Sequence, residues 1–253
     1  MGSRLREKTA LVTGGTGRIG RAVAAALAAE GARVVVSGRD RARGEAVAAA
    51  IRDAGGSADF VAADLDGRAD ASRALAREAT RVLGGRVDIL VNNAGVFPGP
   101  STPETDEATF DAVYGVNVKA PFFLTAALAP AMAEAGGGAI VNIGSWVVRL
   151  GLPAGVAYAA SKGALETLTR SWAAEFGPRG VRVNTVSPGV IREQDGAADG
   201  SGVLMNGTPA GRSGAPDAIA HAVVYLASEE AVFVHGAILD VDGGRVSAAV
   251  IAA

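Results

Sequence analysis

The segment Tyr158-Ala-Ala-Ser-Lys162 carries a phenol and an ammonium group four residues apart, and Ser145 lies thirteen positions before the tyrosine. In a helix this spacing places both side chains on one face, one turn apart. There the Lys162 cation would lower the pKa of Tyr158, which is about 10 in an unperturbed tyrosine. Tyr158 is therefore a candidate proton donor at neutral pH. Both residue types are also common on solvated helix faces, so the pair alone does not define a site.

The composition favours a single domain that binds small molecules. The chain has 253 residues, with 24 basic and 26 acidic residues and a formal net charge of −2. A chain of this length buries about three quarters of the surface that it exposes when unfolded. The basic residues are scattered, without the clustered charge of a nucleic-acid-binding surface. We expect a small-molecule substrate and no nucleic-acid partner.

Few residues are available for metal or disulfide chemistry. The chain has no cysteine and two histidines, His221 and His235, which cannot form the usual ligand shell of zinc. No metal is predicted, although a carboxylate site for magnesium stays open. The first apolar run begins within a few residues of Met1, which leaves no room for a signal peptide, and the uncharged stretch 135–148 is too short for a membrane span. We expect a cytoplasmic protein with no membrane partner.

Short apolar runs alternate with longer helical segments along the chain, which is typical of βαβ units in a parallel sheet. Strands are expected at Thr9–Val12, Arg33–Ser37, Ser57–Ala62, Ile89–Asn92, Ala139–Ile143, Arg182–Val186 and Ala237–Val241. Helices are expected at Arg18–Glu30, Arg41–Ala54, Ala69–Val82, Ala108–Glu134, Val156–Phe176 and Asp217–Ala227. Strands this rich in Val, Ile and Leu are covered by helices on both faces. The pattern predicts one α/β domain over residues 1–253.

The stretch from Gly189 to Arg212 interrupts the alternation, because its middle part has neither a period nor apolar mass. It follows the carboxyl end of a strand, where open α/β sheets bind their ligands. We expect a substrate lid at about 190–211, with disorder as the alternative.

The segment from Thr13 to Gly20, Thr-Gly-Gly-Thr-Gly-Arg-Ile-Gly, follows the first strand and opens the first helix. In this context glycines let the backbone approach a pyrophosphate, which faces the helix N-terminus. A tight turn without a ligand is the alternative, and the position between strand and helix favours binding. The candidate cofactor-binding residues of this turn are Gly14, Thr16, Gly17, Arg18 and Ile19.

The second strand ends without a carboxylate that would hold a ribose 2′-hydroxyl, and Arg39 follows it. A guanidinium suits a 2′-phosphate, so the sequence favours NADP(H), with NAD(H) as the alternative. Arg39 and Asp64 can also be explained without a bound cofactor. Arg39 would then only start a solvated helix, and Asp64 would cap a helix. The other strand ends supply further cofactor-binding candidates at Asp64, Leu65, Asn93, Ala94 and Gly95.

Taken in order, these motifs resemble the short-chain dehydrogenase/reductase family in its compact form. The resemblance covers nearly the whole chain and is specific for the family but not for the substrate. It rests on Thr13-Gly14 to Gly20, Asn92-Asn93-Ala94-Gly95, Asn117, Ser145, Tyr158 to Lys162, and Pro188-Gly189. The resemblance implies a Rossmann-like, doubly wound parallel sheet of about seven strands. It also implies hydride transfer between a nicotinamide dinucleotide and a substrate carbon.

The resemblance also implies residue roles. Tyr158 would be the general acid in reduction and the base in oxidation, and Ser145 would hold the substrate oxygen. Lys162 would act on the Tyr158 pKa and on the nicotinamide ribose. Asn117 would anchor a water that connects Lys162 to solvent; a buried amide within a helix is the alternative. Further cofactor contacts would come from Tyr158, Lys162, Pro188, Gly189 and Ile191.

Two positions depart from the family pattern. Arg18 stands where a glycine is usual and brings a cation within reach of the pyrophosphate. Glu193 stands where the family often has a threonine that bonds the cofactor. A carboxylate near phosphates is repelled, so we expect Glu193 to turn outward or to pair with an arginine such as Arg192.

The leading hypothesis is an NADP(H)-dependent oxidoreductase that interconverts a ketone or aldehyde and an alcohol, such as a 3-oxoacyl or general carbonyl reductase. An NAD-dependent alcohol or sugar dehydrogenase is one alternative, and a non-catalytic dinucleotide-binding regulatory protein is another. The candidates for substrate contact are apolar, which suits a medium-sized carbonyl compound better than a free sugar, although core or interface positions are equally compatible. They are Phe97, Trp146, Val147, Leu150, Leu152, Val203, Leu204 and Met205.

Family members of this size are commonly homotetramers built through two long helices, here 108–134 and 156–176, and through the last strand and tail. The tail 246–253 is apolar and uncharged, which fits burial against a neighbouring copy. We therefore expect a homotetramer.

Overall fold

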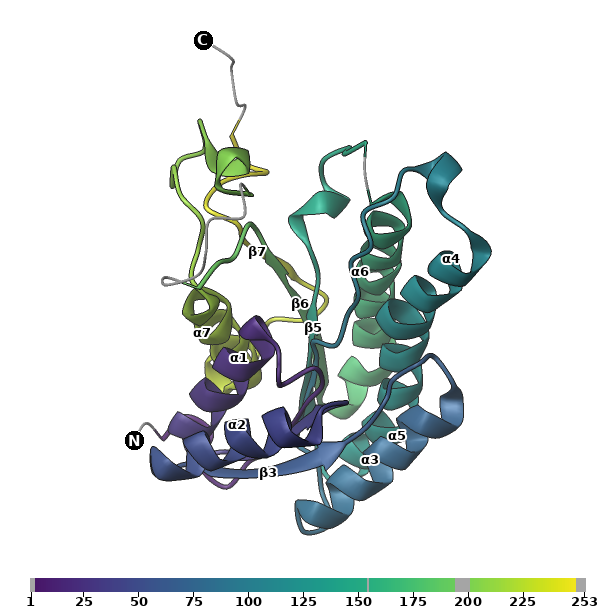
Figure 1. The fold of residues 1–253 in the computed structure, drawn as a ribbon. Coiled ribbons are helices and arrows are strands. Elements are labelled where there is room, and N and C mark those ends of the chain that lie inside the picture. Colours follow the sequence, from purple (N-terminus) through teal and green to yellow (C-terminus); the bar gives the residue numbers. More distant parts are fainter. Residues whose placement is uncertain (1–2, 154, 194–200, 249–253) are drawn as a thin grey trace.

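Seven parallel strands form one sheet at the centre of the computed structural model, which describes residues 3–153, 155–193 and 201–248. The strand order is β3-β2-β1-β4-β5-β6-β7, so the winding direction reverses between β1 and β4. This arrangement is the predicted Rossmann-like, doubly wound sheet in a single domain (Figure 1). The strands are β1 Thr9–Val12, β2 Arg33–Gly38, β3 Ser57–Ala62, β4 Ile89–Asn92, β5 Gly138–Ile143, β6 Val181–Pro188 and β7 Ile238–Val241.

Helices cover both faces of the sheet, as the apolar strands predict (Figure 1). The side chains of α1, α2 and α7 pack on one face in a core that includes Val12 and Val91. Those of α3, α5 and α6 pack on the other face in a core that includes Leu11 and Leu90. The helices are α1 Arg18–Ala29, α2 Arg41–Asp53, α3 Ala69–Val82, α4 Glu107–Tyr114, α5 Ala120–Glu134, α6 Val156–Phe176 and α7 Pro216–Ala227.

The single helix expected at 108–134 is instead two helices joined by a π-helical segment, η2, at Gly115–Lys119. The N–H of Ala120 bonds to the carbonyl of Gly115, five residues back. Gly115 lies against the backbone of Asp66, since a Cβ added there would be 2.9 Å from the Asp66 carbonyl oxygen. A π-helical turn contains one more residue than an α-helical turn, and such turns are often found at functional sites. Periodicity does not reveal it in a segment this apolar.

The continuous stretch Glu107–Glu134 is also the one described helix that is long and apolar enough to cross a membrane by length and composition. Half of its most apolar window is buried inside the protein. Leu124, Leu128 and Met132 are all part of the core beneath the sheet. Packing within the domain therefore accounts for the buried half of this apolar window.

A buried chain of hydrogen bonds ties α6 to the strands β4, β5 and β6. Asn92 donates to Asn142 at 2.8 Å, and Asn142 donates to the Thr169 hydroxyl at 2.8 Å. The hydroxyls of Thr169 and Thr185 lie 2.7 Å apart. All four side chains are buried. Buried polar groups of this kind are costly to leave without partners.

Replacing Thr169 by Val should therefore destabilise the protein by about 1–3 kcal/mol, because the Asn142 amide loses its acceptor in a dry interior. Thermal unfolding should shift down by about 2–10 °C. Thr169→Ser keeps the hydroxyl and serves as the control. A valine variant that melts with the wild-type protein would show that the network contributes no stability.

Candidate active site

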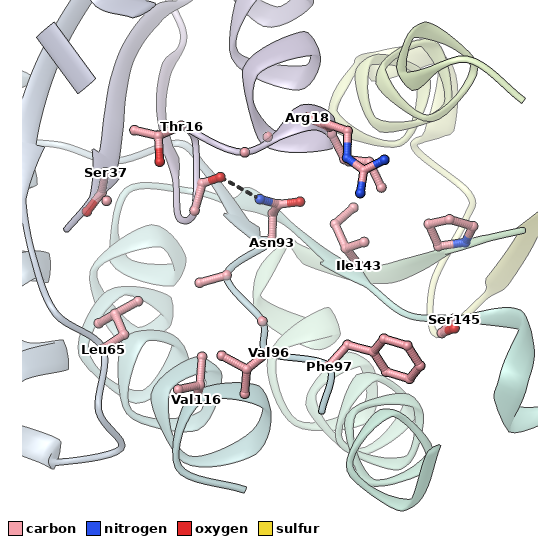
Figure 2. Close-up of a pocket in the computed structure, with 18 of the residues that line it drawn as sticks. Thr16, Arg18, Ser37, Leu65, Asn93, Val96, Phe97, Val116, Ile143 and Ser145 are labelled. Carbon is pink, nitrogen blue, oxygen red and sulfur yellow. Dashed lines mark hydrogen bonds between the residues drawn. The ribbon is translucent and has the colours of Figure 1, made fainter. Parts of the chain in front are cut away.

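A cavity of about 580 Å³ lies at the carboxyl ends of the strands, next to the point where the strand order reverses. Open α/β sheets bind ligands at this place. Figure 2 shows Ser37 and Leu65 on one side of the cavity, and Phe97 and Ser145 on the other. The predicted site residues that line it are Gly14, Thr16, Gly17, Arg18, Ile19, Arg39, Asp64, Leu65, Asn93, Ala94, Gly95, Ser145, Tyr158, Lys162, Pro188, Gly189 and Ile191. Of the predicted site residues, only Asn117 lies outside the lining.

The glycine-rich turn is held open toward this cavity. Asn93 donates to the carbonyls of Thr13 at 2.9 Å and Gly14 at 3.0 Å, and the second bond can be followed in Figure 2. Gly14 has a φ of 60°, and a Cβ there would lie 2.8 Å from Ala94 Cα, so the position requires glycine. Helix α1 begins after Gly17 with no side-chain cap. Its first N–H groups are therefore available to an anion such as a pyrophosphate, and the turn fits a dinucleotide.

Of the two interpretations without a ligand at the ribose end, the structure contradicts the one for Asp64. Arg39 directly precedes Asp40, the N-cap of α2, whose side chain accepts from Arg43 N at 3.0 Å. Asp64 does not cap α3, whose N-cap is Arg68. Arg39 Nε lies 4.0 Å from Asp64 Oδ1, and the arginine side chain is 76% exposed. An exposed pair at this distance is weak, so the guanidinium has donors left for a further anion.

The candidate catalytic side chains meet at the opposite end of the cavity. Ser145 follows β5 and is 6% exposed, and Tyr158 and Lys162 lie on α6. Lys162 Nζ donates to the Ile143 carbonyl at 2.8 Å and lies 5.7 Å from the centre of the Tyr158 ring. The Tyr158 ring in turn lies edge-on to Phe97, with 4.6 Å between ring centroids.

The predicted lowering of the Tyr158 pKa is wrong. Burial raises the pKa of Tyr158, and a hydrogen bond with Ser145 opposes this only in part. Burial also lowers the pKa of Lys162 to about 8, since its ammonium is shielded from water. The Lys162 ammonium is directed to a backbone carbonyl rather than to the phenol. Tyr158 is thus protonated at neutral pH, which is the state that a general acid needs.

Asn117 has the buried-amide environment that the sequence left as an alternative. It is fully buried in η2. Its Oδ1 accepts from Val96 N at 2.9 Å, and its Nδ2 donates to the Val96 carbonyl at 3.1 Å and to Ser161 Oγ at 3.0 Å. The side chain thereby joins the loop after β4 to α6. A Cβ added at Gly95 would lie 3.3 Å from Asn117 Oδ1 and 3.6 Å from Lys162 Nζ, so both atoms border the space that this glycine leaves.

Glu193 turns away from the cofactor cavity, as expected for a carboxylate near phosphates. Its Oε1 pairs with Arg21 Nη2 of α1 at 2.6 Å, so an arginine does pair with it, and that arginine comes from α1. Glu193 and Arg21 line a second cavity beside α1, and neither lines the first. The pair joins residues 172 positions apart, which no local pattern reveals.

The predicted substrate-facing residues divide into two groups. Phe97, Val203 and Leu204 are exposed. Trp146, Val147 and Met205 are buried in a small apolar cluster, and the partly buried Leu150 and Leu152 pack against it. Sequence reasoning did not single out Val96, Val116, Ile143 and Gly144 for the site, although they line the cavity. Ile143 and Gly144 lie at the end of β5, which was an available signal, whereas Val116 lies in η2 and had none.

The described residues contain no group of three or more His, Asp or Glu side chains that could hold a metal ion.

Comparison with known proteins identifies the family. A family model described as enoyl-(acyl carrier protein) reductase matches residues 16–245. D-threitol dehydrogenase of Mycolicibacterium smegmatis is 41% identical, over 95% of this chain and 94% of that protein. The chain is a member of the short-chain dehydrogenase/reductase family, and its relatives are enzymes that act on CH–OH or C=O groups.

Solved structures agree with this assignment. The crystal structure of a putative betaketoacyl-ACP reductase superimposes with a TM-score of 0.88 at 48% sequence identity. The match covers 96% of this chain and 100% of that chain. A blue fluorescent protein from a metagenomic library, in complex with NADPH, superimposes with a TM-score of 0.89 at 35% identity, covering 97% and 100% of the two chains. The chain is therefore an oxidoreductase of this family.

Proposed function

We propose that the protein is an NADP(H)-dependent oxidoreductase that interconverts a ketone or aldehyde and the corresponding alcohol. The observation that carries the proposal is one cavity with Ser145, Tyr158 and Lys162 at one end and Arg39 at the other. The turn before α1, with its uncapped helix N-terminus, would hold the pyrophosphate. General carbonyl reduction and 3-oxoacyl reduction both fit this arrangement.

In the reductive direction, the Ser145 hydroxyl polarises the carbonyl group and Tyr158 Oη gives its proton to the carbonyl oxygen. When bound, the nicotinamide supplies the hydride that reaches the carbonyl carbon, and it is itself oxidised. Lys162, held by the Ile143 carbonyl, would reach the nicotinamide ribose. The space beside Gly95, bordered by Asn117 and Lys162, is where a water would return a proton from solvent. Alcohol oxidation is the same path reversed.

Arg39 is expected to set the preference for NADPH over NADH. Replacing Arg39 by Ala removes a charge-assisted partner of the 2′-phosphate and should raise the Kd for NADPH by about 10- to 100-fold, with little change for NADH. Fluorescence titration with both cofactors measures this. Arg41→Ala, which removes an exposed arginine of α2 outside the cavity lining, is the matched control. Equal weakening for both cofactors would contradict the role.

An NAD-dependent polyol dehydrogenase is the second candidate, favoured by the similarity to D-threitol dehydrogenase. Steady-state rates with both cofactors separate the two. We expect NADPH oxidation with at least one of a panel of apolar ketones, a ketose and a 3-oxoacyl thioester. Faster reduction of NAD⁺ by a polyol would favour the second candidate. Cofactor binding without turnover of any substrate would favour a regulatory dinucleotide-binding protein.

We also propose a cytoplasmic homotetramer whose substrate lid spans about 190–211, of which residues 194–200 lie outside the described part. The exposed groove of about 490 Å³ on α5 and α6 supports the assembly, because apolar side chains dominate it and Phe122 is partly exposed there. Strand β7 is an edge of the sheet, which supports a second interface. Sedimentation equilibrium tests the assembly, and a monomeric mass would contradict it.

A further inference from the structure

Phe97 leaves most of a phenyl ring uncovered beside the candidate catalytic tyrosine. The residue is 64% exposed, lines the cofactor cavity, and lies edge-on to Tyr158 at an interplanar angle of 68°. Single exposed hydrophobic residues are common on protein surfaces. This one differs because it lies within a cavity and touches the ring that carries the reacting hydroxyl. A ligand held by Tyr158 would cover part of the Phe97 ring and remove it from water.

The Phe97 ring occupies space that Gly155, the N-cap residue of α6, leaves open. Gly155 has a φ of 64°, and a Cβ there would lie 2.8 Å from Phe97 Cε2. Its N–H donates to the Pro100 carbonyl at 3.2 Å, which fastens the loop carrying Phe97 to the start of α6. Only glycine combines this backbone conformation with room for the ring. The missing side chain at position 155 thus leaves room for the Phe97 ring to lie edge-on to Tyr158.

Apart from Ser145 and Lys162, the cavity-lining residues that β5, β6 and α6 place around Tyr158 are apolar. The lining residues that come from β5, β6 and α6, with the turns that follow the two strands, have three polar side chains, Ser145, Tyr158 and Lys162. All three are already assigned to the reacting oxygen and the cofactor. Behind Tyr158 lies the buried apolar cluster of Trp146, Val147, Val190 and Met205, with Leu150 and Leu152 against it. A substrate with several hydroxyl groups would therefore find few partners for them in the described residues.

We propose that Phe97 selects the substrate, and that the substrate is an apolar ketone, or its secondary alcohol, with an aryl or alicyclic group against the Phe97 ring. This inference rests on the proposed function and specifies its substrate class. The reaction balances as ketone, NADPH and a proton giving secondary alcohol and NADP⁺. The hydride forms the new C–H bond, and the proton from Tyr158 forms the new O–H bond. The contact with Phe97 takes no part in these steps and only positions the group beside the carbonyl.

The expected selectivity is moderate. A hydrophobic site rejects an analogue that adds hydroxyl groups by about 10²-fold in kcat/KM, because the extra groups lose water without gaining partners. Removing the Phe97 ring should cost about tenfold on an apolar ketone, mainly through KM, since the ring contact stabilises ground state and transition state alike.

The test compares kcat/KM for acetophenone, cyclohexanone and the ketose erythrulose in the wild-type protein, Phe97→Ala and Phe97→Tyr. Gly155→Ala, which displaces the ring, is a second route to the same loss. Phe233→Ala is the matched control, because Phe233 is 99% exposed and does not line the cavity. We expect the wild-type protein and Phe97→Tyr to prefer the two apolar ketones. Phe97→Ala and Gly155→Ala should lose that preference, with kcat/KM falling about tenfold more for the two apolar ketones than for erythrulose. A wild-type preference for erythrulose, or an equal loss on all three substrates in Phe97→Ala, would overturn the inference.

Ligand-observed NMR separates this inference from the proposed function. If no substrate is turned over, the proposed function fails, but saturation transfer to acetophenone can still be measured with NADP⁺ present. Strong saturation transfer in the wild-type protein and in Phe233→Ala, together with weak transfer in Phe97→Ala, would support a contact between the ligand and the Phe97 ring. Equal transfer in all three proteins refutes it.

Discussion

Replacing Tyr158 by Phe is expected to lower kcat for ketone reduction by about 10²–10⁴-fold, the range that a positioned general acid contributes. The substitution removes only Oη. The ring that lies edge-on to Phe97 remains, and the contacts of the glycine-rich turn are untouched. The Kd for NADPH should therefore stay within about threefold of the wild-type value, below the tenfold change that corresponds to 1.4 kcal/mol. Rates at saturating NADPH and a fluorescence titration measure the two quantities.

Tyr225→Phe is the matched control for this substitution, since Tyr225 lies on α7 outside the cavity lining. It should have wild-type kcat. A Tyr158→Phe variant with wild-type kcat would remove Tyr158 from the mechanism. A variant that lost both activity and NADPH binding would instead indicate that the substitution disturbs the cavity.

Replacing Lys162 by Met is expected to abolish turnover and, at the same time, to stabilise the protein without cofactor. Burial lowers the Lys162 pKa from 10.5 to about 8, and this difference corresponds to a cost of about 3 kcal/mol for holding the charged form inside the fold. The Ile143 carbonyl loses its donor in the variant, which offsets about 1 kcal/mol. The net gain of about 2 kcal/mol at neutral pH should raise Tm by about 4–8 °C.

The pH dependence of this effect follows from the direction of the shift. Because the folded-state pKa lies below the unfolded-state value, the unfolded chain binds more protons between pH 8 and 10.5. The contribution of Lys162 to stability is therefore largest above pH 10.5 and is lost as the pH falls through about 8. The advantage of Lys162→Met should be full at pH 7 and shrink toward pH 10.5 in urea titrations of both proteins. A constant difference across this window would contradict a buried charge at position 162.

The sequence was sufficient to predict the strands and most of the cavity because the chemistry follows strand ends. Parallel strands bring their carboxyl ends to one edge, so Gly14, Asn93 and Ser145 converge although they lie far apart in the chain. The apolar strands likewise predict helices on both faces. These features depend on residue type and order, which the sequence contains directly.

Other features depend on a balance of local forces that the sequence does not show. The π-helical segment shifts the register by one residue in an apolar run, so the periodicity of residues 108–134 predicts one helix. Burial raises the pKa of Tyr158, and the Lys162 ammonium donates to the Ile143 carbonyl, so the predicted lowering of that pKa was wrong. The pairing of Glu193 with Arg21 is set by tertiary packing alone.

The most direct test of the account follows an isotope from the cofactor to the product. NADPH carrying deuterium at C4 of the nicotinamide, prepared in each of its two configurations, is incubated with the protein and acetophenone, and the alcohol is analysed by mass spectrometry. We predict that one of the two labelled cofactors places deuterium on the carbinol carbon and that Tyr158→Phe forms almost no product. NADPH binding without formation of labelled alcohol from this or any other carbonyl compound in the panel would contradict hydride transfer as the function of this site.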